Sequence, residues 1–222
     1  MTLRECDKMR AITHHTPDAL LAAYAAGTLS PAFSLVVATH ISICAECRAA
    51  LEGHHAVGGA LLDGSETAIL SDALKSDILA MLDDPTPAAT PLAAREGEGI
   101  YPGPVIEALK GKKPRWRSLG LGLRQAILSD DEHGSVRLLH IPAGQAVPDH
   151  GHNGMELTLV LQGSFSDETG QFARGDLEVA DEDLDHTPVA DGGAPCICLA
   201  ATDAPLRFHS FMPRLFQPFF RI

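Results

Sequence analysis

The chain has 222 residues, of which 45% are hydrophobic and 21% charged, and its formal net charge is −12; this length accommodates one large domain or two modest ones. No apolar run approaches the ~20 residues of a membrane helix, and the mixed charges of the first ten residues do not form a secretory signal, so we expect a cytoplasmic protein with no membrane partner. The negative charge disfavours direct nucleic-acid binding, because phosphate neutralisation needs Lys and Arg, but it suits a basic protein partner.

Residues 16–82 carry apolar side chains at helical intervals and predict four helices. Thr16-Pro17 and Ser30-Pro31 each place a capping residue before a proline at the first helical position, and Gly27 ends the first helix. The third helix follows directly after Cys44, and the fourth is amphipathic and acidic. The expected helices cover residues 17–26, 31–44, 45–62 and 67–82.

Four potential metal ligands lie in this helical region, in the pattern His-x24-His-x3-Cys-x2-Cys formed by His15, His40, Cys44 and Cys47. Two imidazoles and two thiolates are the ligand set of a closed tetrahedral zinc site, and Cys-x-x-Cys is a common half-site spacing. The last three can share one face, so the first helix must fold back to deliver His15. Two alternatives are that His14 takes this place, or that His40 and the cysteines are core residues without a metal.

After the helices the periodicity changes. Residues 86–113 are rich in Pro, Gly and Ala and have no period, which predicts a linker. From residue 114 onward, apolar runs of four to eight residues alternate with Gly, Pro and Asp, which is typical of an all-β sandwich or barrel. The expected protein is therefore of the α+β multidomain class, with a four-helix domain at 9–85, a linker at 86–113 and an all-β domain at 114–222.

A second set of ligands lies in the all-β half. The pattern Gly-x5-His-x-His-x3-Glu-x6-Gly, which contains His150, His152 and Glu156, resembles the first cupin motif, and His186 belongs to a weaker second motif. The first three residues have the same strand parity, so all three should point into the barrel. Together with His186 they predict a site for Zn, Mn, Fe or Ni. The alternative is a cupin barrel that has lost its metal.

The segment HHTPDALLAAYAAGTLSPAFSLVVATHISICAECRA, residues 14–49, resembles the start of the ChrR family of zinc anti-sigma factors in ligand spacing and in the surrounding apolar residues. The resemblance begins near Met9 and extends over most of the first 82 residues. It implies a zinc-organised helical domain that clamps between the two DNA-binding regions of an extracytoplasmic-function sigma factor. It also implies zinc in the cupin site, and it makes the fourth helix a contact surface for the sigma factor.

Three residues of the all-β half have open roles. Cys196 and Cys198 share one face of a strand and lack the reach for an easy disulfide with each other. They are either small apolar core residues or, as the resemblance implies, thiols near the cupin metal that take part in sensing. His140 lies on the opposite strand face from Arg137, and its role stays open.

The first functional hypothesis is therefore a regulator and not an enzyme. The helical domain sequesters a sigma factor and releases it after an oxidative signal, singlet oxygen by resemblance, that the cupin domain senses. The alternative is a metal-dependent cupin dioxygenase or isomerase with a regulatory helical domain. A third hypothesis is a sensor whose barrel binds a small metabolite at the metal.

Overall fold

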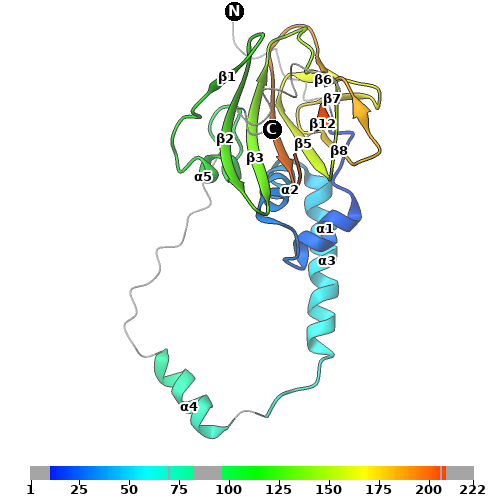
Figure 1. The fold of residues 1–222 in the computed structure, drawn as a ribbon. Helices are drawn as coiled ribbons and strands as arrows, with labels where there is room; N and C mark the ends of the chain where they lie inside the picture. The colour runs from blue at the N-terminus through cyan, green and yellow to red at the C-terminus, as the bar shows by residue number, and fades with distance from the viewer. Residues whose placement is uncertain (1–10, 70, 83–96, 206, 209–222) are drawn as a thin grey trace, which may run out of the picture.

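The computed structural model describes residues 11–69, 71–82, 97–205 and 207–208, and it joins a helical N-terminal region to a β-barrel (Figure 1). This arrangement confirms the α+β class expected from the change of periodicity. The helices of the described residues are α1 (Asp18–Ala25), α2 (Pro31–Ile43), α3 (Ala45–Asp63), α4 (Asp72–Met81) and α5 (Gly103–Ala108).

Side-chain caps mark the starts of α2 and α4. The cap expected from Thr16 at α1 was wrong, because Pro17 is the N-cap and α1 begins at Asp18 without a side-chain cap. The Ser30 side chain accepts a hydrogen bond from the backbone N–H of Phe33, so α2 begins where the sequence predicts. The fourth helix begins later than expected, at Asp72 instead of residue 67, because the side chain of Ser71 caps it. Residues 103–108, expected within the linker, form α5 and bury Val105 completely.

The barrel contains one large sheet and two small ones. The large sheet has the order β1-β2-β3-β11-β5-β8, and the small sheets have the orders β10-β6-β7 and β12-β4-β9. The strands of the described chain are β1 (Arg117–Gly120), β2 (Leu123–Asp131), β3 (Gly134–Ile141), β4 (His150–Gly151), β5 (Glu156–Gln162), β6 (Ser164–Ser166), β7 (Gln171–Ala173), β8 (Leu177–Ala180), β9 (Asp185–His186), β10 (Val189–Ala190), β11 (Cys196–Thr202) and β12 (Arg207–Phe208).

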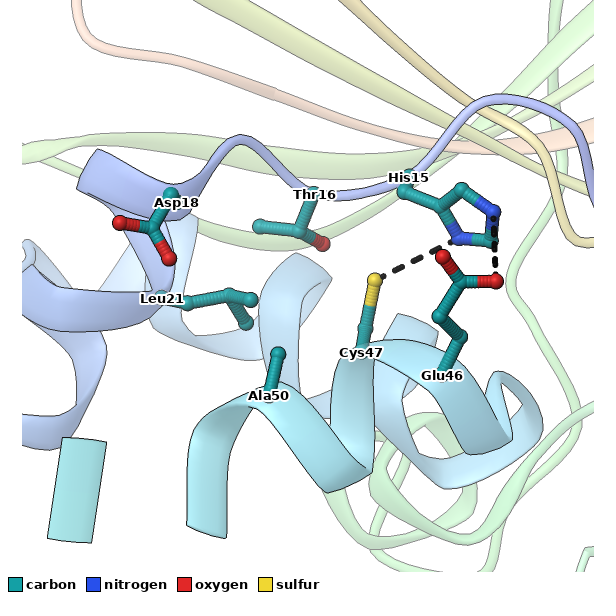
Figure 2. Close-up of a pocket in the computed structure, with 7 residues that line it drawn as sticks. All are labelled: His15, Thr16, Asp18, Leu21, Glu46, Cys47 and Ala50. Atoms are coloured by element: carbon teal, nitrogen blue, oxygen red, sulfur yellow. Dashed lines mark hydrogen bonds and ion pairs between the residues drawn. The ribbon is translucent and has the colours of Figure 1, made fainter. Parts of the chain in front are cut away.

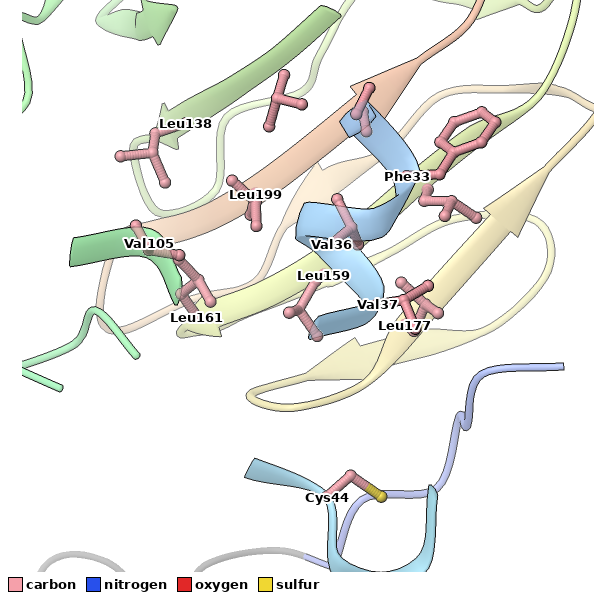
Figure 3. Close-up of a cluster of buried hydrophobic side chains, with 14 of the residues drawn as sticks. Phe33, Val36, Val37, Cys44, Val105, Leu138, Leu159, Leu161, Leu177 and Leu199 are labelled. Carbon is pink, nitrogen blue, oxygen red and sulfur yellow. The ribbon is translucent and has the colours of Figure 1, made fainter. Parts of the chain in front are cut away.

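The two faces of the large sheet have different partners. Its outer face packs against α2, where Phe33, Val36 and Val37 form one core with residues such as Leu159 and Leu199 (Figure 3). Its inner face lines the barrel and carries polar as well as apolar side chains. Because α2 shares its core with the sheet, the helical region and the barrel are packed against each other.

Helices α3 and α4 differ from α2 in their burial. Cys47 and Leu51 are the buried residues of α3, and both lie near its start, while α4 buries none of its own residues. Figure 1 shows α3 extending away from the barrel. In the described ranges, no single helix has the length and apolar composition to cross a bilayer; α2 and α3 pass that test only as a pair, bent by 116° at their junction.

Candidate metal centres

The junction of α2 and α3 gathers the four N-terminal ligand residues. His40 lies in the last turn of α2, Cys44 is the N-cap of α3, Cys47 lies in its first turn, and His15 precedes α1. One ligand atom from each lies within 4.8 Å of all the others. His40, Cys44 and Cys47 come together at the bend between α2 and α3, where Cys44 has extended backbone, and not on one continuous helical face as expected. The fold adds His15 as the fourth residue.

The distances in this N-terminal centre fit a tetrahedral zinc ion. His40 Nε2 lies 3.2 Å from Cys47 Sγ, and His15 Nδ1 lies 3.3 Å from Cys44 Sγ and 3.6 Å from Cys47 Sγ. Ligands that surround zinc at normal bond lengths are separated from one another by about 3.3–3.8 Å. The donor set and its spacing therefore fit the expected metal.

The electrostatics of the centre also suit a cation. Burial lowers the pKa of His40 to about 4, so its imidazole is neutral and free to coordinate. Burial raises the pKa of Cys47 to about 11, so its thiolate forms only with a positive charge beside it. The positive N-terminal end of α3, where both cysteines lie, contributes part of that charge.

The structure places only one of the two candidate histidines beside the cysteines. The ring of His14 packs against Phe172 with a centroid distance of 4.4 Å, and its Nδ1 lies 3.5 Å from Asp176. His15 instead points toward the cysteines. Glu46, which sequence analysis did not single out, lies 3.4 Å from the other ring nitrogen of His15 and lines a small pocket beside the centre (Figure 2).

The barrel interior gathers a second group of ligand residues. His150, His152 and His186 are all buried, and a ligand atom of each lies within 4.8 Å of the others. Antiparallel pairing of β4 with β9 places His150 opposite His186, and the Nε2 atoms of His152 and His186 are 3.3 Å apart. This spacing also fits imidazoles around one metal ion.

Glu156 lies beside these histidines and outside the three-residue group. Its Oε2 is 3.5 Å from Nδ1 of His152, and its Oε1 accepts a hydrogen bond from the hydroxyl of Thr158. Burial lowers the pKa of both His150 and His152, while the negative charge of Glu156 opposes that shift. Its role as a fourth ligand stays a prediction.

Two buried carboxylates behind His186 were missed by the sequence analysis. Asp167 Oδ2 lies 2.7 Å from Nδ1 of His186, and Glu178 Oε1 lies 3.4 Å from the same atom. Burial would raise the pKa of Asp167, but hydrogen bonds from Glu178, Thr169 and His186 hold it well below its usual range. Burial also raises the pKa of Glu178 to about 7. When Asp167 is ionised it accepts a hydrogen bond from the Nδ1–H group of His186. The other ring nitrogen of His186, Nε2, then faces the other histidines.

The two barrel cysteines are buried on the inner face of β11, with their sulfur atoms 3.5 Å apart. Their apolar neighbours include Val160 and Phe165. The hydrogen bond from Cys196, burial and the nearby negative charges of Glu178 and Glu156 raise the pKa of Cys198 well above its usual value. Cys198 is thus a protonated thiol near the cupin centre, and a sensing role for both cysteines stays a prediction.

Arg137 and His140 lie on opposite faces of β3. Arg137 is buried on the inner face and donates hydrogen bonds to the Gln125 amide oxygen and the Ser135 hydroxyl, at 3.1 and 2.6 Å. His140 lies on the other face, 3.1 Å from a guanidinium nitrogen of Arg124 and against the ring of Trp116. Strand alternation thus assigned the two faces of β3 correctly.

Comparison with known proteins agrees with this arrangement. Residues 107–204 match the model of the ChrR cupin-like domain. The chain is 56% identical over 213 residues to the anti-sigma-E factor ChrR of Cereibacter sphaeroides, an alignment that covers 95% of this chain and 99% of that protein. The crystal structure of Rhodobacter sphaeroides SigE in complex with the anti-sigma ChrR matches with a TM-score of 0.75 and 53% identity, over 87% of this chain and 100% of the matched chain.

Proposed function

We propose a function from one premise: the chain belongs to the ChrR family of anti-sigma factors. As a member it is a regulator that binds an extracytoplasmic-function sigma factor, and not an enzyme. The cupin-enzyme alternative is not favoured, because the 56% identical relative is an anti-sigma factor. The sigma factor is held inactive by the N-terminal region, in the cytoplasm, where free thiols persist.

The observation that supports this proposal is an exposed apolar surface along α3 and α4. The second half of α3, the segment after it, α4 and its C-cap residue leave large hydrophobic side chains in solvent, among the described residues Val57, Leu61, Leu62, Ile69, Leu74, Ile78, Leu79, Met81 and Leu82. Exposed apolar patches of this kind mark protein-interaction sites. The net charge of −12 complements the basic DNA-binding regions of a sigma factor and would speed its association.

The N-terminal zinc organises this surface. His15, His40, Cys44 and Cys47 would hold the ion, which supplies a closed tetrahedral cross-link between the segment before α1 and the α2–α3 junction. Because the buried residues of α3 lie near its start, the junction sets the direction in which the exposed half of α3 projects. The anti-sigma domain is residues 9–85, joined by residues 86–113 to the cupin domain at 114–222.

The cupin domain senses the oxidative signal. His150, His152, Glu156 and His186 would hold zinc or another divalent metal, and Cys196 and Cys198 lie in the same interior. Thiols are among the groups that oxidants modify. Singlet oxygen, the signal implied by the family resemblance, alters this centre, and the change leads to release of the sigma factor.

Copurification and transcription assays test the binding surface. Ile78→Asp on α4 should reduce copurification with the sigma factor and relieve its inhibition, because it places a charge in the apolar contact. Leu121→Asp is the matched control, since this leucine is also apolar and exposed but lies in the β1–β2 turn. Full inhibition by the Ile78→Asp variant would contradict the proposed surface.

The domain assignment has its own test. A fragment of residues 1–85 should inhibit the sigma factor unaided, and it should also bind a hydrophobic dye, because removing the sheet uncovers Phe33, Val36 and Val37 of α2. If only the full chain inhibits transcription, the cupin domain belongs to the sigma-binding unit.

A further inference from the structure

The turn between β7 and β8 is hydrogen-bonded to the segment that leads to the N-terminal metal centre. Asp176 in this turn is 1% exposed, and its Oδ1 accepts hydrogen bonds from the backbone N–H groups of Thr13 and His14, at 2.7 and 2.9 Å. The N–H of Leu177 donates to the carbonyl of His14 at 3.0 Å. The barrel thereby holds the two residues that directly precede the ligand His15.

The same turn packs against segments on both sides of that centre. A Cβ placed on Gly175 would lie 3.9 Å from Ile43, the residue before Cys44. Gly175 has a φ of +94°, and a Cβ placed there would meet Ile12 at 2.7 Å. The turn therefore fits closely against the helical region, with no room for a side chain.

The strand that follows the turn reaches the cupin centre. Glu178, two residues after Asp176, lies 3.4 Å from Nδ1 of His186, next to Asp167. Backbone hydrogen bonds tie the turn to β5, from Gly175 to Val160 at 2.8 Å and from Val160 to Asp176 at 3.1 Å. Three consecutive residues thus connect the surroundings of one metal centre to those of the other.

We propose that the β7–β8 turn couples the two centres, and that Asp176 is the positioning residue of this coupling. A displacement of His186 reaches Glu178 directly, and β8 is too tightly packed and hydrogen-bonded to absorb it locally. The turn then transmits the shift to residues 13 and 14 and so to His15. The inference rests on the proposed function, since it names the route by which the cupin domain acts on the anti-sigma domain.

A double-mutant cycle in the full-length, metal-loaded protein tests the coupling directly. The readout is the alkylation rate of Cys44 and Cys47, mapped by mass spectrometry, which rises when the N-terminal centre loosens. His186→Ala should raise this alkylation rate about tenfold. A change of this size corresponds to the loss of roughly one hydrogen bond to a charged group. In the Asp176→Ala background, His186→Ala should add nothing further. An equal effect of His186→Ala in both backgrounds would overturn the proposal.

Asp191→Ala is the matched control, because this carboxylate also accepts three hydrogen bonds within the barrel, from Ser164, Ser166 and Gln171. It should leave the effect of His186→Ala intact. Asp176→Asn keeps one acceptor oxygen, so it should fold and give an intermediate coupling if the alanine variant does not fold. Full wild-type coupling in Asp176→Asn, with no stable alanine variant, would assign Asp176 a structural role only.

Reporter transcription separates this inference from the proposed function. Relative to its own uninduced level, the Asp176→Ala variant should respond less to singlet oxygen than the wild type does, while Asp191→Ala responds normally. If the wild-type protein does not inhibit the sigma factor, the proposed function is refuted. The alkylation measurements then still test the coupling between the two centres. Normal release by Asp176→Ala would refute the coupling alone.

Discussion

Replacing Cys47 by alanine should loosen α1 and α3 while leaving α2 docked on the barrel. A structural zinc site supplies about 10–16 kcal/mol of apparent binding free energy, which is comparable to the ~5–15 kcal/mol that stabilises a whole domain. Without the zinc, α1 and α3 keep only two buried anchors, Leu21 and Leu51. These contribute roughly 1.5–3 kcal/mol each, which is too little to order two helices. In contrast, α2 retains its core with the sheet.

Hydrogen-exchange mass spectrometry resolves the helices separately. In the Cys47→Ala variant, amides of α1 and α3 should exchange far faster than in the wild type, amides of α2 should keep their protection, and copurification with the sigma factor should be lost. Cys198→Ala removes an equally buried thiol from the barrel and should leave α1 and α3 protected. Unchanged protection of α3 in Cys47→Ala, or retained sigma binding, would refute the view that zinc organises this surface.

Three further outcomes are expected. Glu156→Ala should retain inhibition but blunt induction by singlet oxygen in a reporter assay; loss of inhibition would show that the barrel is not a sensing module. Val37→Ala, at a fully buried site between α2 and the sheet, should cost about 1.5–3 kcal/mol in denaturant unfolding, whereas Val57→Ala on exposed α3 should change stability by less than about 0.5 kcal/mol. In the metal-free protein, burial lowers the pKa of His40 from 6.5 to about 4, so the unfolded chain binds a proton that the folded chain excludes. The contribution of His40 to stability is therefore complete above about pH 6.5 and is lost toward pH 4. The drop in urea midpoint between about pH 7.5 and about pH 5 should be smaller in a His40→Asn variant, and an equal drop would contradict this.

Local patterns predicted most of the elements and both groups of ligands. A cap followed by proline determines where α2 begins, because this effect spans only a few residues. The expectation that His40, Cys44 and Cys47 share one helical face was wrong: they meet where the chain bends by 116° between α2 and α3. Strand parity likewise predicted that Cys196 and Cys198 share a face, which their 3.5 Å separation confirms. Only the fold shows that His15, and not His14, lies beside the two cysteines, because two adjacent histidines fit the ligand spacing almost equally well in the sequence.

Long-range packing decided the rest. The apolar face of α2 is visible in the sequence, but nothing in its periodicity says that the partner is a β-sheet more than one hundred residues away. The bonds from Thr13 and His14 to Asp176 join positions 163 and 162 residues apart, and Asp167 reaches His186 from a surface turn. Such contacts leave no local signal, because a buried carboxylate is stable only where the tertiary structure supplies its donors. Sequence alone therefore predicted two groups of candidate ligand residues and the order of a helical and an all-β half, whereas the tertiary structure determined how the surroundings of the two groups are connected.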